Sequence, residues 1–184
     1  MGGLLRKEYG KVLREAFARR LAERLPRFRP VITGSDYLFP GERVFCWAVT
    51  GELHLYVILT PDQRGHEAFT VELGWSRLGR FPELSKRPNI HRPSADGAEF
   101  ARDEAVVRLP YLTGAPEWWT VEEIPDPLTL EALMEQQRKR SPAEAEAQVQ
   151  PLLTEAMDSL ETAGVEFFRA FLRQAGFPDA ARDL

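Results

Sequence analysis

The sequence predicts an α+β fold in which an antiparallel β-sheet is flanked by an N-terminal helix and a C-terminal helical segment. Three observations support it. Apolar residues recur at helical spacing near the N-terminus, β-prone segments follow one another between residues 43 and 76, and helical periodicity returns after residue 128. The 184 residues, 43% of them hydrophobic, are expected to form one domain, with helix and sheet in 1–126 and helices in 127–184.

The N-terminal helix is expected to run from about Leu4 to Leu25. Its apolar residues form a single stripe, which indicates a helix packed against a core. Pro26 and Pro30 end the helix, because proline cannot continue the hydrogen-bonding pattern. The connection that follows is expected to include a short edge strand at residues 37–39.

The β-prone segments at residues 43–50, 53–60 and 69–75 predict an antiparallel meander. Gly51 and Glu52 suit a two-residue type II′ turn, which pairs Thr50 with Leu53. This register and a looser second turn predict a core face that comprises Val44, Cys46, Ala48, Leu55, Val57, Leu59, Phe69 and Val71.

The opposite face of this predicted sheet is more aromatic than a solvated face normally is. Two interpretations remain open: further helices bury it, or it forms the floor of a groove that binds a ligand or a partner. In the predicted register this second face comprises Phe45, Trp47, Val49, His54, Tyr56, Ile58, Thr70 and Glu72.

Residues 77–105 lack periodicity and are rich in proline, glycine and charge, which is typical of a long loop. Its basic residues include Lys86, Arg87 and Arg92. A strand is expected at residues 105–109, followed by an aromatic, β-prone segment that contains Trp118 and Trp119. Pro125-Asp-Pro127 closes the β region.

The C-terminal part is expected to begin with a helix at residues 128–140. Ser141-Pro-Ala-Glu144 then has the pattern of a capping box and predicts the start of a second helix. Pro151 is expected to kink or restart this helix, and Gly164 to allow a break. A last helix is expected at residues 165–174, with Gly176 as its C-terminal stop.

The two ends of the chain carry opposite charge. Residues 1–30 have nine Lys/Arg and three Glu, a charge of +6, whereas residues 121–184 have six Lys/Arg and thirteen Asp/Glu, a charge of −7. We expect the terminal helices to lie near each other and to complement each other's charge. Nucleic-acid binding through the first helix and the basic loop is the weaker alternative, because the pI is near 5.5 and no known nucleic-acid module is present.

The chain has no motif of a known catalytic centre. The predicted register places His54 near Glu72, either as an ordinary cross-strand pair or as an acid–base pair of an enzyme. The three histidines lack metal-ligand spacing, so neither a metal nor a cofactor is expected, and Cys46, the only cysteine, is expected to be an inert core residue. Without a long apolar run or a signal peptide, the protein is expected to be soluble and cytoplasmic.

Two segments carry a resemblance to a known family. Phe69-Thr-Val-Glu-Leu-Gly74 ends the meander, and residues 152–168 form a closing segment that ends in Gly-Val-Glu-Phe-Phe168. With the leading helix, these segments look like a bacterial family of domains of unknown function. Members of that family are sometimes encoded near polymorphic toxin systems, so the resemblance implies an immunity or accessory role and carries no catalytic residues.

We therefore expect a non-catalytic domain that binds another protein, such as a bacterial toxin. The alternative is a small-ligand-binding protein or an enzyme that uses the aromatic second face of the sheet. Composition does not predict the oligomeric state or the identity of the partner. The expected partner-binding residues are Trp47, His54, Tyr56, Glu72, Trp118 and Trp119, with Lys86, Arg87 and Arg92 in the basic loop.

Overall fold

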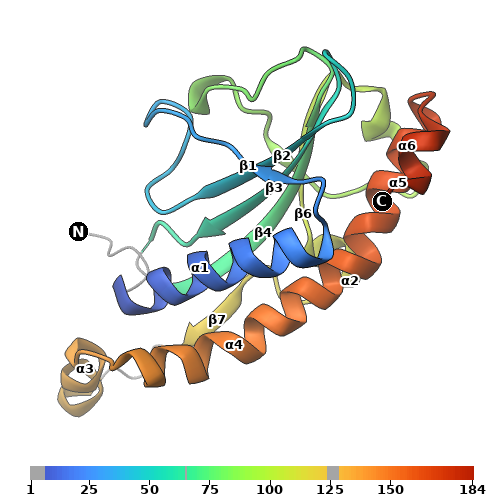
Figure 1. Ribbon diagram of the computed structural model, residues 1–184. Helices are drawn as coiled ribbons and strands as arrows, with labels where there is room; N and C mark the ends of the chain where they lie inside the picture. The colour runs from blue at the N-terminus through green and yellow to red at the C-terminus, as the bar shows by residue number, and fades with distance from the viewer. Residues whose placement is uncertain (1–6, 65, 124–128) are drawn as a thin grey trace.

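The computed structural model of the chain describes residues 7–64, 66–123 and 129–184. It contains one open sheet with helices on one face (Figure 1). The helix α1 (Lys7–Arg24) precedes the sheet, and α4 (Pro142–Ser159) and α5 (Val165–Gln174) follow it. This arrangement confirms the predicted α+β fold.

The sheet has the strand order β1-β2-β3-β4-β6-β5, and β7 also pairs with β4. Its pairs are antiparallel except for β5 with β6, which is parallel. The strands are β1 (Arg29–Pro30), β2 (Arg43–Ala48), β3 (His54–Pro61), β4 (Glu67–Ser76), β5 (Ile90–His91), β6 (Glu104–Arg108) and β7 (Trp119–Glu122).

The edge strand expected at residues 37–39 is wrong. The backbone N–H of Tyr37 donates to the carbonyl of Gly34 (3.1 Å), so this part of the chain turns instead of extending. The edge of the sheet is formed earlier, by the two residues of β1, which pair with Phe45 and Cys46 of β2.

The register predicted for the first hairpin is wrong by one residue. The last ladder pair is Ala48 with His54, so the connection is five residues long instead of two. The Thr50 hydroxyl accepts from the backbone N–H of Leu53 (2.9 Å) and thereby closes a wider turn, and Gly51 does not have the positive φ that a type II′ turn requires. Because side chains alternate along a strand, this slip moves every β2 side chain to the opposite face.

The second hairpin is also offset, but by an even number of residues. Val57 pairs with Leu73 instead of Phe69, four residues further along β4. An even offset leaves each side chain on its predicted face, so the faces of β3 and β4 are as expected. His54 nevertheless lies opposite Ser76, and Glu72 lies opposite Ile58, so the predicted His54–Glu72 pair is wrong.

The helix-covered face of the sheet supplies most of the core. Trp75 stacks on Phe171 of α5, with ring centroids 4.4 Å apart, and Phe28 packs edge-on against Trp47. In Figure 1, α1 lies beside the long α4–α5 helix across this face. The buried strand residues of the core are Phe45, Trp47, Leu55, Val57, Leu59, Phe69, Val71, Leu73, Trp75, Ala105, Val107 and Trp119.

The C-terminal helices form one almost continuous rod. The predicted capping box is confirmed: the Ser141 hydroxyl accepts from the Glu144 backbone N–H, and the Glu144 carboxylate accepts from the Ser141 backbone N–H. The helix continues through Pro151, which lies on its exposed side. Gly176 ends α5 at φ 88°, where glycine is favoured, as predicted.

The break expected at Gly164 is wrong. A single π-helical turn, η3 (Leu160–Gly164), joins α4 to α5. A Cβ atom at Gly164 would lie 2.9 Å from Leu160 Cδ1 and 3.3 Å from both Leu109 Cδ1 and Leu73 Cδ1. Glycine here leaves room for the close approach of the rod to the sheet, and the chain does not turn at this position.

The remaining elements are short. They are α2 (Pro110–Thr113), α3 (Leu130–Gln137) and α6 (Pro178–Arg182), with the 3₁₀ turns η1 (Leu84–Lys86) and η2 (Ala98–Ala101). The predicted helix starts at residues 4 and 128 and the Pro125-Asp-Pro127 stop lie outside the described residues. Among the described helices, none has the length and apolarity that crossing a membrane requires.

The terminal segments complement each other's charge, as the sequence predicts. Arg24 of α1 forms ion pairs with Asp158 (2.9 Å) and Glu161 (2.8 Å) of the C-terminal rod, and Arg27 pairs with Asp183 (2.8 Å). These pairs are solvent-exposed, so each stabilises the fold only slightly. They account for part of the charge asymmetry between the two ends.

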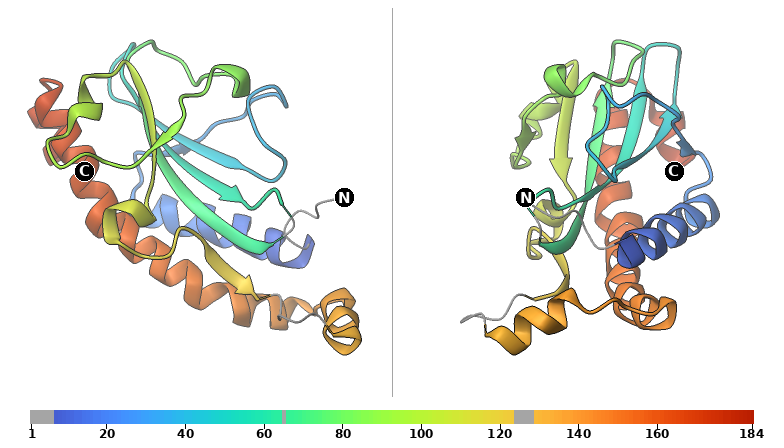
Figure 2. Two further views of the ribbon diagram at one scale, coloured as in Figure 1. Left: turned by 180° about the vertical axis from the view of Figure 1, so that it is seen from behind. Right: turned by 90° about the vertical axis from the view of Figure 1, so that its left-hand side faces the viewer.

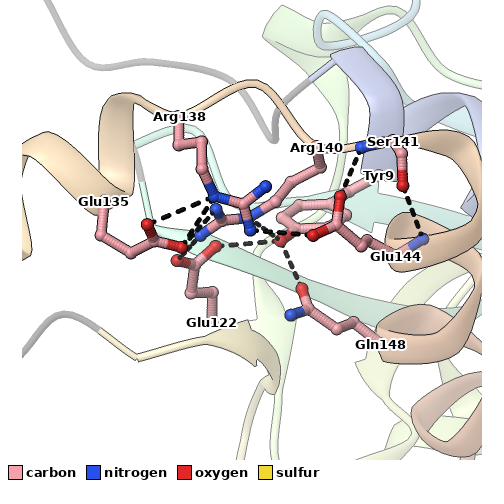
Figure 3. Close-up of polar contacts among 8 residues, drawn as sticks. All are labelled: Tyr9, Glu122, Glu135, Arg138, Arg140, Ser141, Glu144 and Gln148. Atoms are coloured by element: carbon pink, nitrogen blue, oxygen red, sulfur yellow. Dashed lines mark hydrogen bonds and ion pairs between the residues drawn. The ribbon is translucent and has the colours of Figure 1, made fainter.

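A buried arginine, Arg140, connects the helices to β7 (Figure 3). Arg140 lies between α3 and α4, and its side chain is only 3% exposed. Its guanidinium pairs with Glu122 of β7 and Glu135 of α3, and its Nε donates to the Tyr9 hydroxyl of α1 (3.1 Å). The Tyr9 hydroxyl also contacts Gln148 of α4. The Arg140 side chain therefore joins two helices and a strand, and Tyr9 extends the connection to α4.

Replacement of this arginine by an apolar residue is expected to destabilise the protein strongly. Arg140→Met removes the guanidinium from Tyr9, which is fully buried, and from Glu122, whose side chain is 18% exposed, so the free energy of unfolding should fall by about 3 kcal/mol. Urea denaturation measures the change. Arg138→Met is the matched control: Arg138 pairs with Glu135 and Glu144 but is 45% exposed, so a change within about 0.5 kcal/mol is expected. Equal effects of the two substitutions would contradict the proposed role of Arg140.

Candidate functional site

The second face of the sheet is covered by irregular segments and not by helices. Phe81, from the segment that follows β4, packs on Tyr56 with ring centroids 4.9 Å apart. Val44, Tyr56 and Ile58 form a small second core under this segment and under Val31 and Leu38. In the reverse view, residues 77–103 lie on the side of the sheet away from α1 (Figure 2, left).

This cover is incomplete where β3 meets β4. A hollow of about 490 Å³ remains there, with strand residues on its floor and the segments 39–42 and 84–90 along one side. The β3–β4 connection and Trp118 form the opposite side. The charged residues that line the hollow are Glu42, Asp62, Arg64, Glu72, Arg87, Arg108 and Glu117.

One buried ion pair in this wall, Glu42 with Arg87, makes several hydrogen bonds, although Arg87 Nε has no partner among the described residues. The Glu42 carboxylate accepts hydrogen bonds from the Arg87 guanidinium (3.0 to 3.2 Å), the Thr60 hydroxyl (3.2 Å) and the Phe39 backbone N–H (2.9 Å). Arg87 also stacks on Phe81, 5.0 Å from the ring centroid. This pair anchors the covering segment to the sheet, so it is a structural feature of the site.

Glu72, unlike Glu42, is buried without a set of hydrogen-bond partners. Its side chain is 4% exposed and lines the hollow, yet among the described residues it makes no side-chain hydrogen bond. Its one ionic contact is with Arg108 Nε at 3.5 Å, which is too long for a good hydrogen bond. Burial and, next to it, the charge of nearby Glu42 raise the pKa of Glu72 to about 7, against the lowering effect of Arg108 and Arg87.

Arg108 connects Glu72 to the rim. Its guanidinium forms an ion pair with Glu117 and lies over the ring of Trp118, 4.8 Å from the centroid. Its Nε is buried and has no hydrogen-bond partner. Glu72 and Arg108 thus place a carboxyl group and an N–H donor side by side in the hollow, neither of them hydrogen-bonded there.

The rim is partly apolar. Phe39 is 43% exposed and Ile90 is 38% exposed, and both line the hollow together with Trp118. A second hollow of about 450 Å³ lies beyond Trp118 and shares Asp62 and Arg64 with the first. The whole depression therefore combines exposed apolar side chains at its mouth with buried charges on its floor, which is typical of sites for small molecules.

The structure brings together only some of the predicted site residues. Glu72, Trp118 and Arg87 line the hollow. Trp47 and Trp119 lie on the helix-covered face, and Trp119 stacks on Phe69 and donates to Glu155. Trp47 lies on the helix-covered face because the register of the first hairpin is shifted by one residue. The expected register had placed it on the second face.

The other predicted residues lie apart from the hollow. His54 and Tyr56 are at the opposite end of the second face, joined by a 3.2 Å contact between their side chains. Burial lowers the pKa of His54. Lys86 is exposed and pairs with Glu83, and Arg92 lies over the ring of Tyr111, 4.2 Å from the centroid. Lys86 and Arg92 of the basic loop thus each contact a neighbouring side chain.

Sequence reasoning missed Glu42, Thr60, Asp62 and Arg108 as parts of the site. Arg108 had a usable signal: it is a charge next to an apolar run, Ala105-Val-Val107, in a strand that was predicted. A charged residue inside a buried strand requires a partner or a cavity. Glu42 had no such signal in the sequence, because its role depends on contacts with residues far along the chain.

The site does not have the donors of a metal centre: among the described residues, no three His, Cys, Asp or Glu side chains form a group that could hold a metal ion. Comparisons with protein-family models, with curated proteins and with solved structures found no match to this chain. The resemblance to a bacterial family of unknown function stays a prediction.

The pKa of Glu72 has a consequence for stability. Between the ordinary value of 4.5 and the raised value of about 7, folded Glu72 binds more proton than unfolded Glu72, so this group reduces stability as the pH rises through that interval. The difference between these two pKa values corresponds to roughly 3 kcal/mol of unfolding free energy. Glu72→Gln should therefore become more stable relative to wild type by up to about 3 kcal/mol between pH 5 and pH 8.

Urea denaturation of both proteins across this pH range measures the effect. Glu83→Gln removes a carboxylate that is 40% exposed and should leave the pH dependence as in wild type. Parallel stability curves for wild type and Glu72→Gln would contradict the raised pKa.

Proposed function

We propose that this protein binds a small molecule in the hollow between β3, β4 and Trp118. One observation carries the proposal: Glu72 is buried, faces the hollow, and has as its one polar side-chain contact among the described residues Arg108 Nε at 3.5 Å, which is too long for a good hydrogen bond. A buried carboxyl group without hydrogen bonds costs several kcal/mol. Such groups cluster at functional sites, where a ligand supplies the missing interactions.

The size and lining of the hollow support the same proposal. About 490 Å³ lies within the range of about 300–1,000 Å³ that is usual for small-molecule sites. The polar groups at the floor are held by strands β3, β4 and β6, so they are positioned before a ligand arrives. The apolar rim residues Phe39, Ile90 and Trp118 offer contacts to a hydrocarbon or ring portion of the ligand.

This proposal develops the alternative in which the second face binds a small ligand. Recognition of a protein partner, including an immunity role against a toxin, stays a prediction, but two of the tryptophans expected to anchor that partner are buried in the main core. Binding at the hollow does not depend on Trp47 or Trp119.

Acid–base catalysis is a second candidate. A carboxyl group whose pKa is about 7 is well matched to proton transfer near neutral pH, and Glu72 faces a cavity that can hold a substrate. An enzyme would convert the bound molecule, and Glu72→Gln would abolish that conversion. A binding protein would release the molecule unchanged.

A ligand screen tests the proposed function. We expect a metabolite library to yield compounds that raise the unfolding temperature, and Glu72→Gln to weaken their binding at least about tenfold in calorimetry, the loss expected for one charged hydrogen bond. His54→Ala is the matched control, because His54 lies on the same strand at the other end of this face. A ligand that binds Glu72→Gln normally but not His54→Ala would contradict the assigned site.

A further inference from the structure

We infer that the ligand of this hollow carries a basic nitrogen group, an ammonium or a guanidinium, that binds the Glu72 carboxylate. The inference rests on the proposed function and names its ligand class.

The charges that line the hollow leave Glu72 without a full counter-charge. Glu42 is neutralised by Arg87, and Glu117 by Arg108, which are ion pairs within the wall. Once these two pairs are set aside, the lining retains Glu72, Asp62 and Arg64. The remaining balance is −1 with Glu72 ionised, and a ligand with a single positive charge brings it to zero.

Asp62 and Arg64 do not compensate Glu72 themselves. The Asp62 carboxylate accepts from the backbone N–H groups of Arg64 (2.7 Å) and His66 (3.2 Å), which fixes it within the β3–β4 connection. The Arg64 side chain has no ion pair with Glu72 among the described residues and is exposed at the mouth. A cationic group at the floor would thus have Glu72 as its direct partner.

An anionic ligand fits the hollow less well. Arg87 Nε and Arg108 Nε are the buried lining donors without a hydrogen bond among the described residues; Arg87 is already paired with Glu42, and Arg108 Nε lies 3.5 Å from the Glu72 carboxylate. An anion bound there would sit against Glu72, with Glu117 on the same guanidinium. Like charges at that separation repel strongly where water is excluded. A neutral hydroxyl could donate to Glu72 but would leave its charge uncompensated.

The surroundings favour an organic cation over a bare metal ion. No group of three acidic or metal-ligating side chains occurs among the described residues, so a metal ion would lack ligands. The rim offers Phe39, Ile90 and Trp118, which can contact the carbon chain that bears the nitrogen. The adjoining hollow adds the carboxylate of Glu123, whereas its other glutamate, Glu122, is paired with Arg140.

Binding of such a cation is linked to proton release. The groups that face Glu72 are Glu42, Arg87 and Arg108, and their combined effect with burial leaves Glu72 partly protonated near pH 7. The cation binds the ionised form, so its affinity rises as the pH increases. With the raised pKa of about 7, the affinity should be about tenfold higher at pH 8 than at pH 6.

NMR titrations with matched probes test the inference. Butylamine, butyrate and 1-butanol share one carbon chain and differ only in the head group, and butylamine stays protonated at both pH 6 and pH 8. We expect butylamine to shift the Trp118 indole N–H and the amides around Glu72, with the pH dependence given above. Glu72→Gln should remove this binding, and His54→Ala should keep it.

Two further probes distinguish the source of the cation. Butylguanidine, with one positive charge, represents a free guanidinium metabolite, and N-acetyl-arginine-methylamide, with the same charge, represents an arginine side chain of a peptide. Tighter binding of butylguanidine than of the blocked arginine would assign a metabolite, and the reverse would assign a protein segment. Either result supports a cationic ligand.

The outcomes separate this inference from the proposed function. If butyrate or 1-butanol binds the hollow more tightly than butylamine, the ligand class is wrong while the hollow remains a binding site. If butylamine binds equally well to wild type and Glu72→Gln, the inference is overturned. If no probe perturbs residues of the hollow at either pH, both the inference and the proposed function fail.

Discussion

The site depends on the burial of alternate residues of β3 and β4 against the helices. Val71 and Leu73 are fully buried in the main core, and Trp75 stacks on α5. Each large apolar side chain that leaves water stabilises the fold by about 2 kcal/mol, so this set cannot be exchanged for the opposite face. Because side chains alternate along a strand, Glu72 must then point to the second face. Its position follows from the packing of its neighbours and not from a partner of its own.

The buried charged groups of the protein lie in two different kinds of environment. Arg140 and Glu42 are each surrounded by several partners, and they connect segments that are distant in the chain: Arg140 joins helices to β7, and Glu42 joins the covering segment to the sheet. Buried charges that make several hydrogen bonds hold the segments they connect in one arrangement. Glu72 is equally buried but has a single long contact, and it faces a cavity. This difference, and not charge or burial alone, distinguishes the proposed binding site from the structural clusters.

Sequence patterns predicted the α+β fold, the strands, the capping box at Ser141 and the complementary charges of the two ends, because each depends on local periodicity or on nearest neighbours. The register of the first hairpin was beyond such patterns. Gly51-Glu52 suggested a two-residue turn, whereas the Thr50 hydroxyl stabilises a longer one, and this difference of one residue moved Trp47 into the core. The site was predictable only in part: Glu72 stands out in an apolar strand, but its distance from His54 depends on an offset of the second hairpin that no local signal fixes.

We propose that Glu72 is a buried carboxyl group whose single long contact, with Arg108, leaves room for a ligand to complete its interactions. The most direct measurement is an NMR titration of the Glu72 side-chain carboxyl carbon in the ligand-free protein, assigned by comparison with Glu72→Gln. The account predicts a midpoint near the raised pKa of about 7. A midpoint at the ordinary value of 4.5 would show that the carboxylate is well solvated or well paired, and would contradict the account.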